Sequence, residues 1–112
     1  FGVNKNRVWG SRMEVLFRTR KLQKQYLDYR EGEKSFGKKV ARKYILRVNT
    51  IKISKDIEEL RRQSVLHCHP LKGKRAGQWA VNLTEYYRLI FSLHGKSLEV
   101  VRIEEESKHY GD

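Results

Sequence analysis

Basic and imidazole side chains gather in one stretch, His67–Gly77, which also holds the chain's one proline and two of its eight glycines. Proline and glycine at this density predict an irregular loop. His69, Lys72, Lys74 and Arg75 would be displayed along that loop, and three strong bases within four positions are typical of a phosphate site. The alternative is a solvated basic loop that holds no ligand.

Arg88 is a second candidate, because it lies between Tyr87 and Leu89 in an otherwise apolar run. An arginine in such a strand must either pair with a carboxylate or emerge on the other face of the sheet. On a free face its guanidinium could grip a phosphate with two parallel hydrogen bonds. The alternative is a structural ion pair with Glu99 or Glu104 on a neighbouring strand.

The sequence gives less support to other kinds of functional site. The stretch His67–His69, with His94 or His109 elsewhere, lacks the second cysteine pair or His-x₃-His spacing of a metal site, so no metal is expected. Cys68 is expected to be a packing residue. No glycine-rich nucleotide motif occurs. The acidic run Glu104–Glu106 is expected to be a solvated edge rather than a hydrolytic carboxylate pair.

The first half of the chain has helical periodicity. A strand is expected over 15–17, followed by a helix that Thr19 caps and that ends at Glu31 and Gly32. A second helix should begin at Ser35. Its apolar stripe comprises Phe36, Val40, Ala41, Tyr44, Ile45 and Val48. A basic face lies outside the stripe and includes Lys38, Lys39, Arg42 and Lys43. One further helical turn, capped by Ser54 or Asp56, is expected to follow.

The second half changes to the two-residue period of strands. Strands are expected over 78–83 and 87–93 and around Val100 and Val101, with short hairpin connections. Tyr86, in one connection, is an aromatic residue that could stack on a base. Helices followed by a meander predict an α+β fold, with two N-terminal helices packed on one face of a small antiparallel sheet. The other face would then be free to form a basic surface.

Composition narrows the class of protein. The 112 residues contain 25 Lys and Arg against 13 Asp and Glu, a net charge of +12, which points to a polyanionic partner such as nucleic acid. Residues 1–12 show no periodicity and are interpreted as an added leader or a disordered extension, so that 13–112 form one domain. A single cysteine favours the cytoplasm, and no apolar run is long enough for a membrane span.

Three segments together resemble the HigB-type branch of the RelE/ParE toxin superfamily, also described as plasmid maintenance killer proteins. The segments are His-Pro-Leu-Lys-Gly at 69–73, Gly-Gln-Trp-Ala-Val-Asn-Leu at 77–83 and Tyr-Arg-Leu-Ile-Phe at 87–91. The resemblance implies a RelE-like, microbial RNase-like fold and a bacterial type II toxin that cuts messenger RNA on the ribosome. It also implies a cognate antitoxin of the HigA kind with a helix-turn-helix domain, through which DNA is contacted only indirectly.

The resemblance also implies roles for individual residues. His69, Lys72 and Arg88 match motif positions, and Arg75 lies in the loop where the family often has a basic residue. The family commonly ends in a Tyr-His pair, whereas this chain has the reverse order, His109 and Tyr110.

RNA can be cut without metal or cofactor when its 2′-OH attacks the neighbouring phosphate, assisted by a base, an acid and cations. We expect Arg88 and Arg75 to stabilise the developing charge, His69 or Lys72 to assist proton removal, and His109 or Tyr110 to supply the acid. Lys74, Tyr86 and the basic face of the second helix would bind RNA. Two other functions stay open: a ParE-like toxin that poisons gyrase without catalysis, and a plain basic RNA-binding module.

Overall fold

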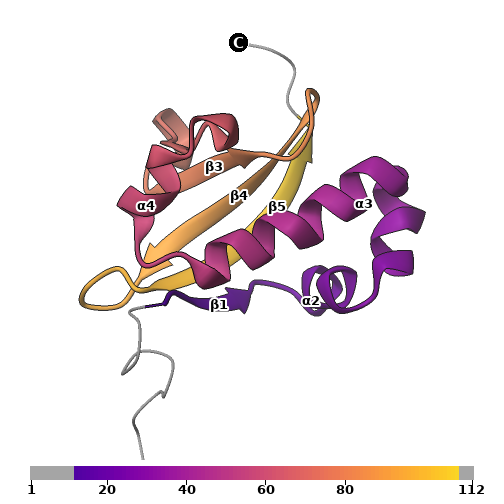
Figure 1. Ribbon diagram of the computed structural model, residues 1–112, viewed down its shortest axis with the longest axis horizontal. Helices are drawn as coiled ribbons and strands as arrows, with labels where there is room; N and C mark the ends of the chain where they lie inside the picture. Colours follow the sequence, from indigo (N-terminus) through magenta and orange to yellow (C-terminus); the bar gives the residue numbers. More distant parts are fainter. Residues whose placement is uncertain (1–11, 109–112) are drawn as a thin grey trace, which may run out of the picture.

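Five strands form one sheet in the computed structural model, which describes residues 12–108 (Figure 1). The order of the strands across the sheet is β1-β5-β4-β3-β2. Their bounds are β1 Glu14–Phe17, β2 His69–Pro70, β3 Gln78–Asn82, β4 Tyr87–His94 and β5 Val100–Lys108. Neighbouring strands are antiparallel, except that β1 runs parallel to β5. The expected α+β class is confirmed, and the β1–β5 pair makes the sheet a mixed one. The leader or extension proposed for 1–12 lies outside the described residues apart from Arg12.

The helices cover one face of this sheet. They are α2 (Arg20–Leu27), α3 (Tyr29–Ile53) and α4 (Ile57–Arg62), and two 3₁₀ turns follow, η1 (Ser64–Leu66) and η2 (Gly73–Arg75). In Figure 1, α3 crosses in front of β5 and α4 lies in front of β3. The opposite face of the sheet has no helix among the described residues. Within the same part of the chain, no helix is both long enough and apolar enough to cross a membrane.

Capping side chains set most of the helix ends. The Thr19 hydroxyl accepts from the backbone N–H of Leu22, as expected, and Asp56 caps α4 by accepting from Glu59 N–H. The expected boundary at Glu31 and Gly32 is wrong. The first helix already ends at Leu27, because Asp28 leaves helical geometry and accepts from Arg30 N–H to begin α3.

Two glycines explain the shape of α3. Gly32 lies inside the helix, and a β-carbon there would approach the Ala41 side chain to 3.2 Å, so glycine permits close packing at this point. Gly37 has a φ of +85° and interrupts the helix, so the expected second helix runs regularly from Lys38 rather than from Ser35. The interruption separates a short first segment from the long segment that packs on the sheet.

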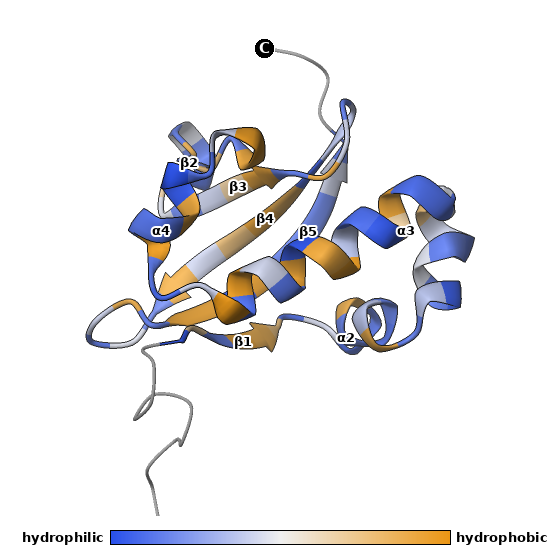
Figure 2. Cartoon of the chain, in the orientation of Figure 1, coloured by the Kyte–Doolittle hydropathy of each residue, from blue (hydrophilic) through white to orange (hydrophobic). Residues whose placement is uncertain are grey.

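The core lies between α3 and the helix-covered face of the sheet. Tyr44 and Val48 of α3 and Phe91 of β4 are fully buried, and the Tyr44 hydroxyl donates a 2.7 Å hydrogen bond to the Leu22 carbonyl. Figure 2 shows β4 as mainly hydrophobic, whereas the C-terminal part of β5 is hydrophilic. Apolar burial of this kind is worth roughly 25 cal/mol per Å² and is the main force that holds helices to sheet. The apolar stripe expected for the second helix is thereby confirmed.

A β-bulge shifts the register between β4 and β5. Ile103 pairs with Phe91 and Glu105 pairs with Ile90, so Glu104 is an extra residue without a cross-strand partner. Because successive residues of a strand point to opposite faces, the bulge reverses the alternation of every later residue of β5. Glu105 therefore lies on the helix-free face and Glu106 on the helix-covered face.

Candidate active site

The strand register brings polar side chains from four strands together on the helix-free face. One cross-strand row comprises His69, Ala80, Ile90 and Glu105, and the next comprises Asn82, Arg88 and Ser107. Ala80 and Ile90 are fully buried and form an apolar floor between polar ends. Low-polarity surroundings strengthen the interaction of nearby charges with a ligand, so this face offers a favourable position for bound anions.

A pocket of about 390 Å³ includes one residue of each row, His69 and Arg88. Its lining residues are His69, Pro70, Leu71, Lys72, Arg75 and Arg88. Four of the six candidate catalytic residues thus line a single pocket, although they come from β2, the loop after it, η2 and β4. Three of the four carry a fixed positive charge at neutral pH. Their arrangement suits a phosphate or another compact anion.

Arg75 is held in place by two acceptors on different strands. Its Nη1 donates to Gln78 Oε1 at 2.8 Å, and its Nη2 donates to Glu105 Oε1, with which it forms an ion pair. These contacts leave the guanidinium beside the pocket with its orientation fixed. Gln78 and Glu105 were not among the expected site residues. The Gly-Gln-Trp segment could have indicated Gln78, but only the bulge places Glu105 here.

Arg88 lies in the same pocket and has no carboxylate partner among residues 12–108. Its Nε is buried and has no hydrogen-bond partner among residues 12–108. The expected structural ion pair is not seen in that range: Glu104 binds Arg18 and Arg102 instead, and Glu99 lies at the other end of β5 from Arg88. A buried donor without a partner is costly, so an incoming anion would be favoured here.

The ring of His69 has a defined orientation. Its Nδ1 lies 2.8 Å from the carbonyl oxygen of His67, and because a carbonyl can only accept, Nδ1 carries the proton. In the neutral ring Nε2 therefore has a free lone pair. His67 adopts a left-handed backbone conformation, with φ at 49°, that sets this carbonyl. His69 and Pro70 form a short strand paired with β3, so the expected irregular loop is wrong at these two positions.

The acidic run is not a solvated edge, and that expectation is wrong. Glu104 and Glu106 are buried, and only Glu105 is partly exposed. Burial alone would raise the pKa of Glu104, but hydrogen bonds from Ser92 and Arg102 and the charges of Arg102 and Arg18 lower it below its ordinary value. Glu104 is thus an ionised clamp at the bulge. Three consecutive acids suggest solvent exposure, and nothing in the run itself indicates the bulge.

The remaining candidates lie around the pocket or away from it. Lys74 is exposed in η2, and Tyr86 is 60% exposed in the turn that precedes β4. Lys38, Lys39 and Arg42 are exposed on α3, and Lys43 is half-buried there, so these four lie on the element that covers the other face. His109 and Tyr110 lie outside the described residues, and they follow Lys108, which pairs with Tyr87 next to Arg88.

Cysteine and metal chemistry have little support among the described residues. Burial raises the pKa of the Cys68 thiol to about 11, so it stays protonated and unreactive at neutral pH. In the same part of the chain, no group of three or more histidine, cysteine, aspartate or glutamate side chains is arranged to hold a metal ion.

Comparisons with known proteins identify the family and the fold. The family model of HigB-like toxins, described as the RelE-like toxin of the type II toxin–antitoxin system HigB, matches residues 15–103. A search of curated proteins finds no match.

Solved structures share the fold over most of the chain. A YoeB/ParE toxin from Agrobacterium tumefaciens is 20% identical, with a TM-score of 0.53 over 88% of this chain and 100% of the other. YafQ from E. coli strain BL21(DE3) is 16% identical, with a TM-score of 0.58 over 88% and 99%. A YoeB–YefM complex from Staphylococcus aureus is 15% identical, with a TM-score of 0.57 over the same shares. At such identities the likeness concerns the fold.

Proposed function

The chain belongs to the HigB-type, RelE-like toxins of type II toxin–antitoxin systems, and we propose that it is an endoribonuclease that cuts messenger RNA on the ribosome. The observation that carries this proposal is the single pocket that His69, Lys72, Arg75 and Arg88 line together. If these residues only stabilised the fold, the buried Nε of Arg88 would be expected to have a hydrogen-bond acceptor, and it has none among residues 12–108.

The proposed reaction is transesterification within the RNA. The 2′-oxygen loses its proton and attacks the adjacent phosphorus, and the bond to the 5′-oxygen breaks, leaving a 2′,3′-cyclic phosphate and a 5′-hydroxyl. His69 is the better base of the two candidates, because its Nε2 is free to accept a proton whereas a lysine ammonium has no lone pair to accept one. Lys72 then serves as a cation at the phosphate.

Charge grows on the non-bridging phosphate oxygens during the attack. Arg88 supplies a guanidinium that has no carboxylate partner within the described range 12–108. Arg75 supplies one whose position Gln78 and Glu105 fix. Preorganised donors stabilise such charge without reorganisation at the moment of reaction, and one donor is typically worth ~10²–10³-fold in rate. The acid that protonates the leaving 5′-oxygen would be His109 or Tyr110.

Binding of the large substrate needs a second surface. Two basic surfaces suit ribosomal RNA, because their charge attracts phosphates over a wide area. They are the exposed Lys74 and the basic face of α3, which comprises Lys38, Lys39, Arg42 and Lys43. Tyr86 is exposed enough to stack on a base. The same basic surfaces would bind an acidic segment of a cognate antitoxin, for which a HigA-like helix-turn-helix protein is expected. The toxin would act in the bacterial cytoplasm.

One experiment separates this function from the alternatives. The purified chain is incubated with messenger RNA alone, with messenger RNA on programmed ribosomes, and with DNA gyrase in a supercoiling assay. The proposal expects cleavage on ribosomes and no effect on supercoiling. Gyrase inhibition without cleavage would favour a ParE-like toxin. Salt-sensitive RNA binding without either activity would favour a binding module.

A further inference from the structure

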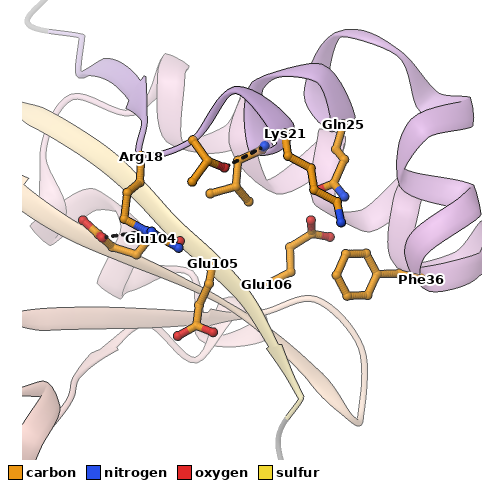
Figure 3. A pocket seen from close by; sticks show the side chains of 9 residues that line it. Arg18, Lys21, Gln25, Phe36, Glu104, Glu105 and Glu106 are labelled. Carbon is orange, nitrogen blue, oxygen red and sulfur yellow. Dashed lines mark hydrogen bonds and ion pairs between the residues drawn. The ribbon is translucent and has the colours of Figure 1, made fainter.

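A second pocket, of about 310 Å³, lies on the helix-covered side of β5 (Figure 3). It opens between α2, which contributes Lys21, Leu22 and Gln25, and Phe36 of α3. Glu106 of β5 belongs to its lining. This volume is at the lower end of the roughly 300–1,000 Å³ that small-molecule sites occupy. Of the residues that line this second pocket, only Glu105, which holds Arg75, also takes part in the pocket described above.

Glu106 is the unusual group in this pocket. Its exposed fraction is 8%, and both carboxyl oxygens are buried without a hydrogen-bond partner among residues 12–108. Figure 3 shows it extending toward Lys21, Gln25 and Phe36, while Glu105 extends to the other side of the strand. Buried carboxylates are normally paired or hydrogen-bonded, so an unpartnered one aimed into a pocket indicates a missing ligand.

The neighbours of Glu106 restrict what that ligand can be. Phe36 offers an aromatic wall, which an edge-to-face contact with Tyr87 at 5.6 Å holds in place. The amide nitrogen of Gln25 is bound to the Ser35 hydroxyl at 3.2 Å, so Gln25 is also fixed. Lys21 is exposed, and its charge acts on Glu106 although the two form no ion pair among the described residues. The pocket thus combines two adjacent acceptors, one cation on a flexible stem and a flat apolar surface.

Two adjacent acceptors match a planar group with two parallel N–H donors, which means a guanidinium or the N1–H and N2–H₂ edge of guanine. A guanidinium would bring a second cation against Lys21. Guanine instead presents its O6 acceptor next to the N1–H donor, where Lys21 can donate to it. Adenine would present an amino group at that position and has no donor at N1. We infer that this pocket binds an unpaired guanine nucleotide, with the base against Phe36, its Watson–Crick edge on Glu106 and O6 on Lys21.

Binding can be measured without reference to cleavage, so this inference and the proposed nuclease function can fail separately. Calorimetric titration of the full chain with GMP, IMP and AMP at pH 8, where the Glu106 carboxyl is ionised, tests recognition of the base. We expect GMP to bind at least ~10-fold more tightly than AMP, with IMP weakened because it lacks the 2-amino group. Glu106→Gln should remove most of the preference, because the amide supplies one acceptor instead of two. Glu85→Gln, in an exposed turn, is the matched control.

The source of the nucleotide is tested with RNA pentamers that carry one central guanosine or one inosine. If the protein prefers guanine both in mononucleotides and in RNA pentamers, a mononucleotide is a sufficient ligand. If it prefers guanine only in the pentamers, the pocket binds a base of the RNA chain. Equal binding of guanine and adenine ligands, or an unchanged preference in Glu106→Gln, would overturn the inference. Loss of antitoxin affinity in Glu106→Gln without any guanine preference would also overturn it, in favour of an arginine of the partner protein.

Discussion

Arg75 donates a hydrogen bond to Glu105 although the two residues lie 30 positions apart in the chain. The ion pair joins the turn η2 to the central part of β5 and brings a carboxylate to the edge of a pocket that is otherwise cationic. A negative charge at a proposed phosphate site is unfavourable for binding. Its presence is best explained by the orientation that it gives to Arg75, whose Nη1 then reaches Gln78.

Loss of this ion pair should reduce cleavage more than stability. Both side chains are 38% exposed, so Glu105→Ala should cost less than ~1 kcal/mol in the free energy of unfolding. Misplacement of a catalytic group can cost ~10²-fold in rate, and we expect a loss of ~10- to 100-fold that Glu105→Gln partly restores. The assay is ribosome-dependent cleavage by Arg75→Ala, Glu105→Ala and the double variant. Strictly additive losses would contradict a shared role.

The cluster of cations was largely predictable from the sequence. His69, Lys72 and Arg75 lie close together in the chain, and the apolar neighbours of Arg88 indicate that its side chain leaves the core. Strand alternation then places Arg88 on the free face of the sheet. What the pattern could not provide was the pairing of β2 with β3, since a two-residue strand has no periodicity of its own.

The positions of Glu104, Glu105 and Glu106 could not be predicted from the sequence, because the faces to which they point depend on one extra residue in β5. Without the bulge at Glu104, Glu105 would face the helices and Glu106 would face the proposed catalytic pocket. Bulges depend on pairing between strands that are distant in sequence. The end of the first helix was misplaced for a related reason: Gly32 resembles a terminator, but it is a contact point for Ala41 inside α3.

The proposed base is tested by substitution. His69→Gln should lower cleavage by ~10²–10⁴-fold, because the amide cannot accept a proton from the 2′-OH. His94→Gln, which replaces an exposed histidine at the far end of β4, is the control and should cleave at the wild-type rate. A folded His69→Gln protein that cleaves at the wild-type rate would remove His69 from the mechanism.

The basic face of α3 should contribute to docking and not to the chemical step. Replacing Lys38, Lys39, Arg42 and Lys43 by Gln should weaken ribosome binding, measured by co-sedimentation over a range of salt concentrations. For every phosphate that the variant no longer binds, the slope of log K against log salt should decrease by about 0.7–0.9. The cleavage rate on saturating ribosomes should stay close to wild type. A salt slope that does not change would show that this face does not touch RNA.

Glu106 should make the protein less stable as the pH rises. Burial raises the pKa of Glu106 to about 7, against an ordinary value of 4.5, and Lys21 offsets only part of this effect. Between these two values the unfolded chain releases the proton before the folded protein does, so the free energy of unfolding falls by about 3 kcal/mol as pH rises from 4.5 to 7. Above pH 7 it should level off.

Urea unfolding of the wild type and Glu106→Gln at pH 5 and pH 8 tests this prediction. The variant should be more stable than the wild type at pH 8 and should show less change between the two. Other groups near Glu106 are Lys21, Tyr44, Arg18 and Glu104, and Glu104, whose pKa is lowered, loses its stabilising effect only in more acidic solution. Equal pH dependence of the two proteins would show that Glu106 ionises normally.

The most direct test of the account is cleavage of messenger RNA on programmed ribosomes by Arg88→Ala. Arg88 has no carboxylate partner in the described part of the chain, so its removal should leave the melting temperature close to wild type. Loss of its guanidinium should lower cleavage by at least ~10²-fold, with partial recovery in Arg88→Lys. Arg62→Ala, an exposed arginine at the end of α4, should cleave normally. A folded Arg88→Ala protein that cleaves at the wild-type rate would contradict the proposed active site.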